Sequence, residues 1–284
     1  MRPPYVTPEA LRDLITIALS EDIGSGDITT EATVPADANA RGRMVAKDAG
    51  VLAGIEVAVA VFHQTNQELD IQVHMPDGTT VKSGDVVMEV SGHARSLLSA
   101  ERVALNVVQR MSGIATYTHQ LCLQLAGTGV QLLDTRKTTP GFRSLEKWAV
   151  AIGGGVNHRY NLSEMILLKD NHIDMAGGIG AAIRKVRQLH HDKRIEVETR
   201  TMKEVQEVLE AGGVDIILLD NMSVADLTMA VKLIGGRCKT EASGGISPES
   251  LSAVAATGVD YVSMGALTHS YKSLDLNFKV MAWE

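Results

Sequence analysis

The sequence is poor in cysteine and aromatic residues and has no long apolar run. Its only two cysteines, Cys122 and Cys238, lie far apart, so they give little support to a disulfide or a metal–thiolate site. No segment approaches the roughly 20 consecutive apolar residues that a membrane-spanning helix needs. The first residues also lack the apolar core of a secretory signal. We therefore expect a cytoplasmic protein with no membrane partner.

Positive charge is also scarce. The formal net charge is −7 at pH 7 and the pI is about 5.7, which argues against nucleic acid as the main partner. Aromatic residues make up only 4% of the chain, whereas it has 26 glycines and is rich in alanine, valine and leucine. This composition is typical of an α/β protein with close strand–helix packing. The 284 residues are sufficient for one large domain or two modest ones.

One window, residues 134–172, departs from this acidic background. It contains six lysines and arginines against four acidic residues, a net charge of +2, with two histidines beside them. A charge run is usually a solvated surface face. Here, however, Arg136 and Lys137 directly follow one short apolar run, and Lys169 directly follows another. Cations at the ends of buried strands favour an anion-binding pocket.

The C-terminal half alternates short apolar runs with helical patterns. The intervening segments are mostly ten to twenty residues long, which is typical of βα units with parallel strands. Six such units predict an incomplete α/β barrel of six to seven units, smaller than the eight-unit form. The runs are VQLLDT, MILLKD, RIEVET, VDIILLD, CKTEAS and VDYVSM.

The N-terminal part has a different pattern, which predicts an α/β sandwich-like domain. Helical periodicity covers Pro8–Ser20, with Thr7 as the N-cap and Pro8 at the first helical position. A long helix is expected over Arg95–Ala126, with a break near Gly113. The other expected elements are a helix over Val57–Phe62, strands over Arg41–Lys47 and Leu69–Met75, and a hairpin-like pair of strands within Val81–Gly92.

These patterns divide the chain into two domains. We expect the N-terminal domain to cover residues 1–115 and the barrel to cover residues 116–270. The final segment, residues 271–284, lies beyond the barrel pattern and is expected to fold back onto the N-terminal domain. In α/β barrels the active site lies at the carboxyl ends of the strands. The polar residues that end the six runs are therefore the candidate site.

Two acidic residues, Glu198 and Asp220, end neighbouring runs. Paired carboxylates that face an anion usually act through Mg²⁺, which takes one or two protein carboxylates together with phosphate oxygens and water. The alternative is that one of them balances Lys169 in a structural ion pair. Glu196 lies on the same side of its strand as Glu198, because strand side chains alternate with a period of two.

Glycines end the last two runs. Gly244 and Gly245 follow Ser243, and Gly265 follows Ser263 after one residue. Both segments precede helical patterns, and barrel proteins commonly hold a phosphate with late-strand loops and helix N-termini. A glycine pair alone is more often only a turn, but its position after a strand favours a phosphate site.

Three segments, TRKTTPGFRSLEKWAV, GGGVNHR and LLKDNH, resemble core motifs of the quinolinate phosphoribosyltransferase family, and the resemblance covers nearly the whole chain. It implies a decarboxylating pentosyltransferase (EC 2.4.2.19) of de novo NAD biosynthesis. The implied reaction joins quinolinate to phosphoribosyl pyrophosphate and gives nicotinate mononucleotide, pyrophosphate and CO₂. The implied cofactor is Mg²⁺ and the implied assembly is a homodimer, with a higher assembly of dimers left open. No protein nucleophile is required, in agreement with a sequence that offers no convincing Ser/His/Asp or Cys/His arrangement.

The resemblance also assigns roles to individual residues. Lys137, Glu198 and Asp220 are the expected catalytic residues, with the two acids as ligands of Mg²⁺. Arg102 is expected to bind substrate in the partner subunit's site, the alternative being a surface ion pair with Glu101. The expected substrate-binding residues are Arg102, Arg136, Lys137, His158, Arg159, Lys169, Glu198, Asp220, Ser243, Gly244, Gly245, Ser263 and Gly265.

We consider three alternative functions. Nicotinate phosphoribosyltransferases use a barrel of this type but bind one carboxylate, which needs fewer cations than Arg136, Arg159 and Lys169 provide. The non-enzyme alternative is a paralogue linked to molybdate transport, and the intact segments RKTTPG, NHR and KDNH argue weakly against it. A generic anion-binding module would not explain Glu198 and Asp220.

Overall fold

The computed structural model describes residues 2–282 of the chain. These residues form two compact units, each made of segments that are separate in the sequence. Among the described residues, no helix is both long enough and apolar enough to cross a membrane. Among the described residues, the first unit contains 2–119, 139–154 and 267–282, and the second contains Gln120–Thr138 and Gly155–Ala266.

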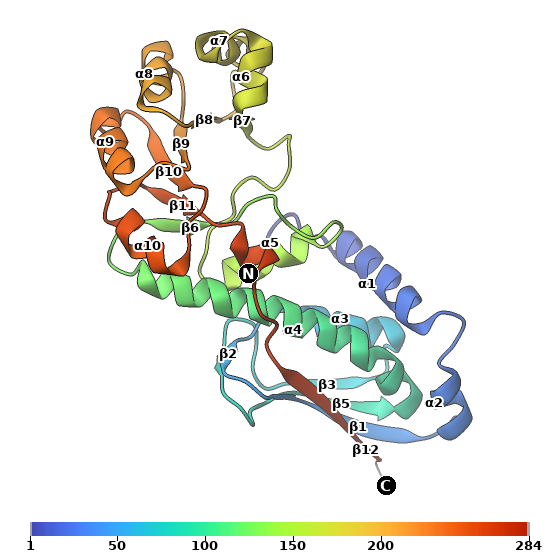
Figure 1. Cartoon of the computed structure of the whole chain (residues 1–284). Coiled ribbons are helices and arrows are strands. Elements are labelled where there is room, and N and C mark those ends of the chain that lie inside the picture. The colour runs from blue at the N-terminus through green and yellow to red at the C-terminus, as the bar shows by residue number, and fades with distance from the viewer. Residues whose placement is uncertain (1, 283–284) are drawn as a thin grey trace. The chain divides into compact units, whose positions relative to one another are not determined.

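The first unit is built on an antiparallel sheet with the strand order β12-β1-β5-β3 (Figure 1). Side chains of β1 are alternately exposed and buried, as expected for a sheet with one face on the core. The last strand pairs with β1, so a segment from the end of the chain completes the N-terminal sheet. The strands are β1 (Asn39–Ala46), β3 (Asp70–Val73), β5 (Val86–His93) and β12 (Leu276–Ala282).

The expected pairing within Val81–Gly92 is wrong. Strand β4 (Thr80–Val81) pairs with β2 (Gly50–Val51), whereas β5 lies between β1 and β3 in the main sheet. Between them Asp85 accepts a hydrogen bond from the backbone N–H of Lys82 through Oδ2 (2.9 Å) and so closes a turn. The turn was foreseeable from the sequence, but the partners of the two strands come from distant segments.

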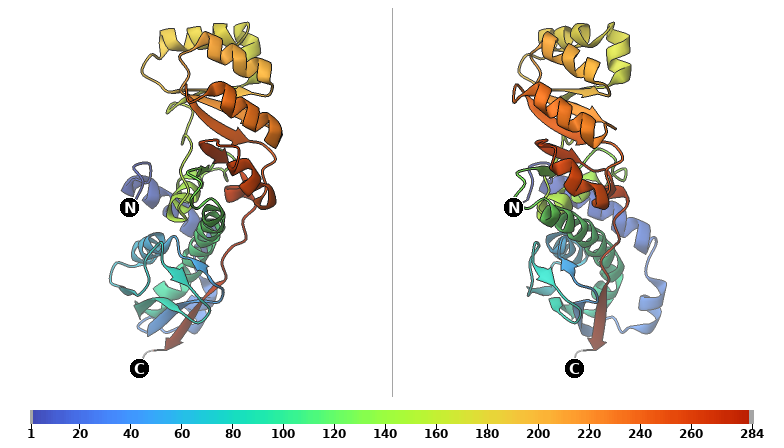
Figure 2. Two further views of the ribbon diagram at one scale, coloured as in Figure 1. Left: turned by 90° about the vertical axis from the view of Figure 1, so that its left-hand side faces the viewer. Right: turned by 60° about the vertical axis from the view of Figure 1, so that its left-hand side comes forward.

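Helices α1 to α5 belong wholly or mostly to the first unit. Thr7 caps the first of them through a hydrogen bond from the backbone N–H of Ala10 (3.2 Å), and Pro8 is its first residue, so the predicted start is confirmed. Figures 1 and 2 show α4 running along the four-stranded sheet. The helices are α1 (Pro8–Ile23), α2 (Ile28–Thr33), α3 (Ile55–Thr65), α4 (Ala94–Gln124) and α5 (Arg143–Ile152).

Helix α4 is continuous over 31 residues, so the expected break near Gly113 is wrong. The glycine serves a close approach of another segment. A Cβ at this position would lie 2.3 Å from the carbonyl oxygen of Lys272 and 2.8 Å from the Cα of Ser273. The segment that leads to β12 can therefore cross the helix only where the helix has no side chain.

The second unit contains a parallel sheet of six strands with the order β6-β11-β10-β9-β8-β7. All six predicted runs form these strands. Strands β6 and β7 are the two edges, and Val156 makes an isolated parallel bridge with Leu133 on the free side of β6. The arrangement agrees with the predicted incomplete barrel. The strands are β6 (Gln131–Leu133), β7 (Ile166–Leu168), β8 (Ile195–Thr199), β9 (Ile216–Asp220), β10 (Lys239–Ser243) and β11 (Tyr261–Ser263).

Helices follow these strands in chain order. Neighbouring helices contact one another from α6 to α10 and form one layer beside the sheet (Figure 1). Because the strands are parallel, all their carboxyl ends lie at the same edge, and the residues that follow them are brought together there. The helices are α6 (Asp170–Ala176), α7 (Ile179–Leu189), α8 (Met202–Ala211), α9 (Val224–Ile234) and α10 (Pro248–Ala255), with the short α11 (Ala266–His269) after β11.

Candidate active site

A cavity of about 610 Å³ lies at the carboxyl ends of the parallel strands, entirely within the second unit. Its volume is in the range of small-molecule sites. The lining contains every predicted site residue of this unit except Gly265. These residues are Arg136, Lys137, His158, Arg159, Lys169, Glu198, Asp220, Ser243, Gly244, Gly245 and Ser263.

Two predicted residues are not part of this lining. Gly265 follows β11 two residues after Ser263, just before α11. Arg102 lies on α4 in the first unit and is exposed. Its neighbour Glu101 is partly buried, which raises the pKa of that carboxyl, and the positive charge of Arg102 opposes the rise. The donation of Arg102 to a partner subunit stays a prediction.

Arg159 is the most buried cation of the cavity, with 9% of its surface exposed. Its Nη1 donates to the carbonyl oxygen of Met165 (2.9 Å), whereas its Nε is buried and has no hydrogen-bond partner among residues 2–282. Burial, and then the nearby charge of Arg136, lowers the pKa of this guanidinium. An anionic ligand could accept a hydrogen bond from this buried Nε. Its negative charge would also offset the repulsion between Arg159 and Arg136.

Asp134 holds the loop that presents His158. It is fully buried at the end of β6. Its Oδ1 accepts from the backbone N–H of His158 (2.8 Å), and its Oδ2 accepts from the Nδ2 of Asn157 (2.7 Å). One carboxylate at the end of β6 therefore holds the Asn157–His158 part of the segment GGGVNHR in place.

Beneath His158 lie two buried glutamates. Its Nε2 is 2.8 Å from Oε2 of Glu196 and 3.8 Å from Oε2 of Glu241. Burial raises the pKa of Glu196 to about 7, and burial together with the charge of Glu196 raises the pKa of Glu241 to about 8. The sequence placed Glu196 and Glu198 on one side of β8, but the contact between Glu196 and His158 is visible only in the structure.

Glu198 and Asp220 both line the cavity, from the neighbouring strands β8 and β9. Lys169 Nζ lies 3.0 Å from Oε2 of Glu198, so the ion pair considered as the alternative role for this acid is present. Asp220 accepts from Nδ2 of Asn221 through Oδ2 (2.8 Å). Two carboxylates that open into one cavity offer the hard oxygen donors that Mg²⁺ prefers, so the residues fit this ion.

Arg200, which the sequence analysis missed, also lines the cavity. Its guanidinium lies within 3.6 Å of oxygens of Asp170, Glu198 and Asp220. A signal was present in the sequence, since Glu196, Glu198 and Arg200 follow one another with a period of two.

The loop after β10 requires its two glycines. Gly244 and Gly245 have φ values of +87° and +62°, which residues with side chains rarely adopt. A Cβ on Gly244 would lie 2.4 Å from Oδ1 of Asn221. Asn221 itself has a φ of 55° and donates its backbone N–H to the carbonyl oxygen of Ser243 (2.8 Å). The glycines therefore let two loops come close at the mouth of the cavity.

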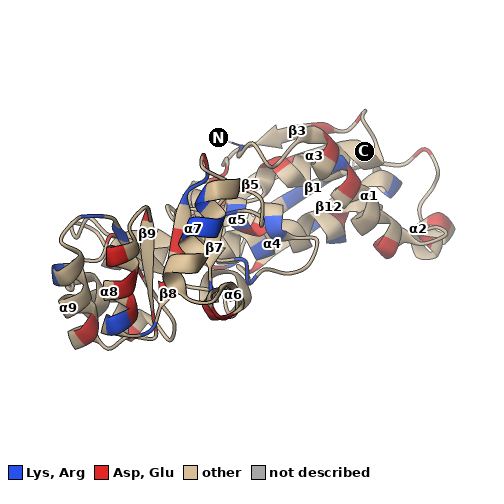
Figure 3. Cartoon of the chain, turned by 90° about the horizontal axis from the view of Figure 1, so that it is seen from above, with Lys and Arg blue, Asp and Glu red and all other residues tan. Residues whose placement is uncertain are grey.

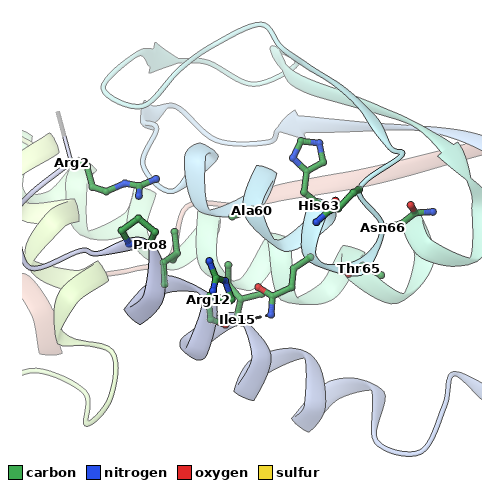
Figure 4. A pocket seen from close by; sticks show the side chains of 11 residues that line it. Arg2, Pro8, Arg12, Ile15, Ala60, His63, Thr65 and Asn66 are labelled. Atoms are coloured by element: carbon green, nitrogen blue, oxygen red, sulfur yellow. Dashed lines mark hydrogen bonds between the residues drawn. The ribbon is translucent and has the colours of Figure 1, made fainter.

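The first unit has a pocket of its own, of about 560 Å³, between α1 and α3 (Figure 4). Several of its polar groups already have partners. Arg2 pairs with Glu56, and Nε2 of Gln64 donates to the carbonyl oxygen of Arg12 (3.3 Å). None of the predicted site residues lines this pocket.

On helices α8 and α9 of the second unit, positively and negatively charged residues are mixed (Figure 3).

Comparisons with known proteins agree on one family. Family models described as the N-terminal and C-terminal domains of quinolinate phosphoribosyl transferase match residues 27–112 and 114–279. The chain is 43% identical to the probable nicotinate-nucleotide pyrophosphorylase (carboxylating) of Bacillus subtilis, over 95% of this chain and 93% of that protein. It is also 43% identical to quinolinate phosphoribosyltransferase (decarboxylating) 2 of Nicotiana glauca, over 99% and 85%.

A solved structure shows the same fold. The crystal structure of NadC from Streptococcus pyogenes superimposes with a TM-score of 0.94 at 43% identity, and the match covers 98% of this chain and 99% of that one. The agreement in fold therefore extends over both units of the chain.

Proposed function

This chain belongs to the quinolinate phosphoribosyltransferase family, and from this we infer that it transfers the phosphoribosyl group of phosphoribosyl pyrophosphate to quinolinate with decarboxylation. The products are nicotinate mononucleotide, pyrophosphate and CO₂, and the reaction belongs to NAD biosynthesis. The activity is that of a decarboxylating pentosyltransferase, and the Nicotiana glauca relative is named a decarboxylating quinolinate phosphoribosyltransferase.

The observation that carries this proposal is the cationic wall of the strand-end cavity. Arg136, Arg159 and Lys169 line one cavity together with His158. Quinolinate is a dicarboxylate, and arginine can bind a carboxylate through two parallel hydrogen bonds. Nicotinate carries a single carboxylate and would leave part of this positive charge unbalanced.

Glu198 and Asp220 are the proposed ligands of Mg²⁺. Their carboxylates open into the cavity from neighbouring strands, and both already attract cationic side chains. When bound there, Mg²⁺ would neutralise charge that builds up on the pyrophosphate oxygens. Lys137, which lines the same cavity, is proposed to bind the pyrophosphate as a catalytic cation.

The glycine-containing ends of β10 and β11 are the proposed phosphate site. Ser243, Gly244, Gly245 and Ser263 line the cavity, and α10 begins three residues after Gly245. Backbone N–H groups near a helix N-terminus favour a phosphate. Gly265 is proposed to extend this site beyond Ser263. We assign this phosphate site to the 5-phosphate of phosphoribosyl pyrophosphate.

The reaction needs no protein nucleophile. The bond between C1 of the ribose and the pyrophosphate oxygen breaks, and the pyridine nitrogen forms its new bond to C1. The bond to the 2-carboxylate then breaks and CO₂ leaves, because the quaternised nitrogen stabilises the electron pair left on the ring, and a proton from solvent takes the place of the carboxylate at C2. The protein contributes alignment of two anionic substrates and stabilisation of the charge that develops on the leaving pyrophosphate.

Assembly and location are part of the same proposal. We propose a homodimer in which Arg102 binds substrate in the partner subunit's site; its exposed position on α4 leaves it available for such a contact. A cytoplasmic location agrees with the two free cysteines, Cys122 and Cys238.

The substrate can be tested by offering quinolinate and nicotinate separately as acceptors, each with phosphoribosyl pyrophosphate and Mg²⁺. Chromatography of the products should show nicotinate mononucleotide from quinolinate and none from nicotinate. Product from nicotinate alone would move the assignment to the single-carboxylate enzyme. No product from either acceptor, with a folded protein, would favour the transport-linked paralogue.

A further inference from the structure

Arg200 occupies a fixed backbone position beside the two acids proposed to hold Mg²⁺. It directly follows β8, and its backbone N–H donates to Oε2 of Glu204 (2.6 Å). The same oxygen accepts from the backbone N–H of Thr201 (3.1 Å), the N-cap of α8. The capping interaction therefore anchors the backbone of Arg200, while its side chain remains 51% exposed.

One guanidinium bridges three carboxylates from three elements. Its Nη2 lies 2.9 Å from Oδ2 of Asp170 on α6 and 3.3 Å from Oε1 of Glu198 on β8. Its Nε lies 3.6 Å from Oδ2 of Asp220 on β9. Lys169 takes the other oxygen of Glu198, Oε2, at 3.0 Å. The protein thus supplies its own positive charge at the place where the acids would receive a metal ion.

The three contacts differ in length and in the exposure of the acid. The shortest is to Asp170, which is 44% exposed and does not line the cavity. The longer two are to Glu198 and Asp220, which are 8% and 18% exposed and line it. Because the contacts with Glu198 and Asp220 are the longer ones, the guanidinium can leave these two acids when another cation takes its place and keep its shorter contact with Asp170.

A magnesium ion and the guanidinium compete for the same oxygens. A magnesium ion held by Glu198 and Asp220 would use the carboxylate oxygens that the guanidinium now contacts, so its binding would weaken those contacts. A displaced guanidinium would remain at the cavity wall, where its planar donors suit the oxygens of a pyrophosphate.

We propose that Arg200 is a mobile counter-ion that holds Glu198 and Asp220 in the substrate-free protein and turns to the pyrophosphate of the substrate when a metal ion takes its place. This proposal rests on the function proposed above. It makes Arg200 a further residue that binds phosphoribosyl pyrophosphate. It also predicts that the protein alone binds a divalent cation weakly, because an internal cation must first be displaced.

The test compares Arg200→Gln and Arg200→Lys with the unaltered protein, using Arg184→Gln on the exposed face of α7 as the matched control. Binding of Mn²⁺ to the substrate-free protein is followed by electron paramagnetic resonance of the free ion. Arg200→Gln should bind Mn²⁺ about fivefold more tightly, because the competing ion pair is gone. Arg200→Lys and Arg184→Gln should resemble the unaltered protein.

Calorimetry of phosphoribosyl pyrophosphate in the presence of Mg²⁺ gives the second readout. Arg200→Gln should weaken this binding by about tenfold, since a charge-assisted hydrogen bond to phosphate is lost. A folded Arg200→Gln protein with unchanged affinity for both ligands would overturn the proposal. A Glu198→Gln protein that binds Mn²⁺ as the unaltered protein does would instead show that the metal site itself is wrong.

Discussion

His158 depends on two residues that do not reach solvent. Glu196 is fully buried and Glu241 is 1% exposed, yet both lie within 3.8 Å of the imidazole Nε2. One oxygen of each, Oε1 of Glu196 and Oε2 of Glu241, has no hydrogen-bond partner among residues 2–282. Buried carboxylates without enough partners favour the protonated form. These two side chains therefore determine the charge beneath the cationic wall.

The folded chain should accordingly lose stability as the pH rises. Burial raises the pKa of Glu241 from 4.5 to about 8, so the folded protein keeps a proton that the unfolded chain releases near pH 4.5. Between these values the free energy of unfolding falls with pH, by up to about 1.4 kcal/mol per pH unit for each such group. Glu241→Gln replaces this carboxyl by an amide that does not titrate. The free energy of unfolding of this variant should therefore fall less steeply as the pH rises.

Urea unfolding between pH 5 and pH 8 measures this effect. Glu68→Gln, at an exposed position, is the control and should follow the unaltered protein. Parallel pH dependence of Glu241→Gln and the unaltered protein would mean that Glu241 is ionised in the folded state throughout this range.

At the level of single residues, the sequence identified most of the cavity lining but not how its members pair. Strand ends were recognisable because apolar runs stop at charged residues such as Lys169 and Asp220. Arg200 was missed because the predicted run RIEVET ends at Thr199, one residue before it, whereas the run MILLKD includes Lys169. Its role depends on Asp170 and Asp220, which only the fold brings beside it.

Strands and helices were predicted well where local pattern decides and poorly where a distant segment decides. Most of the six parallel strands of the second unit lie in short apolar runs that alternate with helical patterns, so composition and spacing were sufficient. The partners of β4 and β5 could not be read from the turn between them, because β2, β1 and β3 complete their pairing. The continuity of α4 at Gly113 likewise depends on the segment that crosses it.

Two helical glycines should therefore respond oppositely to alanine. At Gly113 a Cβ meets backbone atoms that cannot move aside easily, so Gly113→Ala should destabilise the protein by about 1–3 kcal/mol. At Gly180 in α7 the nearest atom is Nη1 at the end of the flexible Arg184, 3.3 Å away. There Gly180→Ala should stabilise by up to about 1 kcal/mol, because alanine has the higher helix propensity.

Thermal and urea unfolding of the two variants checks this contrast. Stabilisation by Gly113→Ala would contradict the view that the glycine is needed for the crossing of the segment before β12. A loss of stability in both variants of similar size would point to a general effect of the added methyl group.

For the whole molecule, the main prediction is that Arg102 binds substrate in the partner subunit's site of a homodimer. Arg102→Ala and Arg136→Ala subunits should each be inactive on their own and remain folded. If Arg102 is donated across a dimer, a mixed dimer contains one site with both arginines. Random mixing in equal amounts should then restore about a quarter of the unaltered activity, since half the dimers are mixed and each has one intact site.

Activity of the mixture and native mass spectrometry of the subunit exchange decide this point. Verified exchange without any recovery would show that each site is complete within one subunit. Inactive single variants that have lost their circular dichroism spectrum would be replaced by Arg102→Lys and Arg136→Lys.

The central claim, that the strand-end cavity couples phosphoribosyl transfer to loss of a carboxylate, is tested most directly with quinolinate labelled in the 2-carboxylate. The purified protein is incubated with this substrate, phosphoribosyl pyrophosphate and Mg²⁺, and released labelled CO₂ is counted. We predict release that stops when any one of the three is omitted and that is lost in Arg136→Ala. Release that continues without phosphoribosyl pyrophosphate, or its absence with all three present, would contradict the assignment.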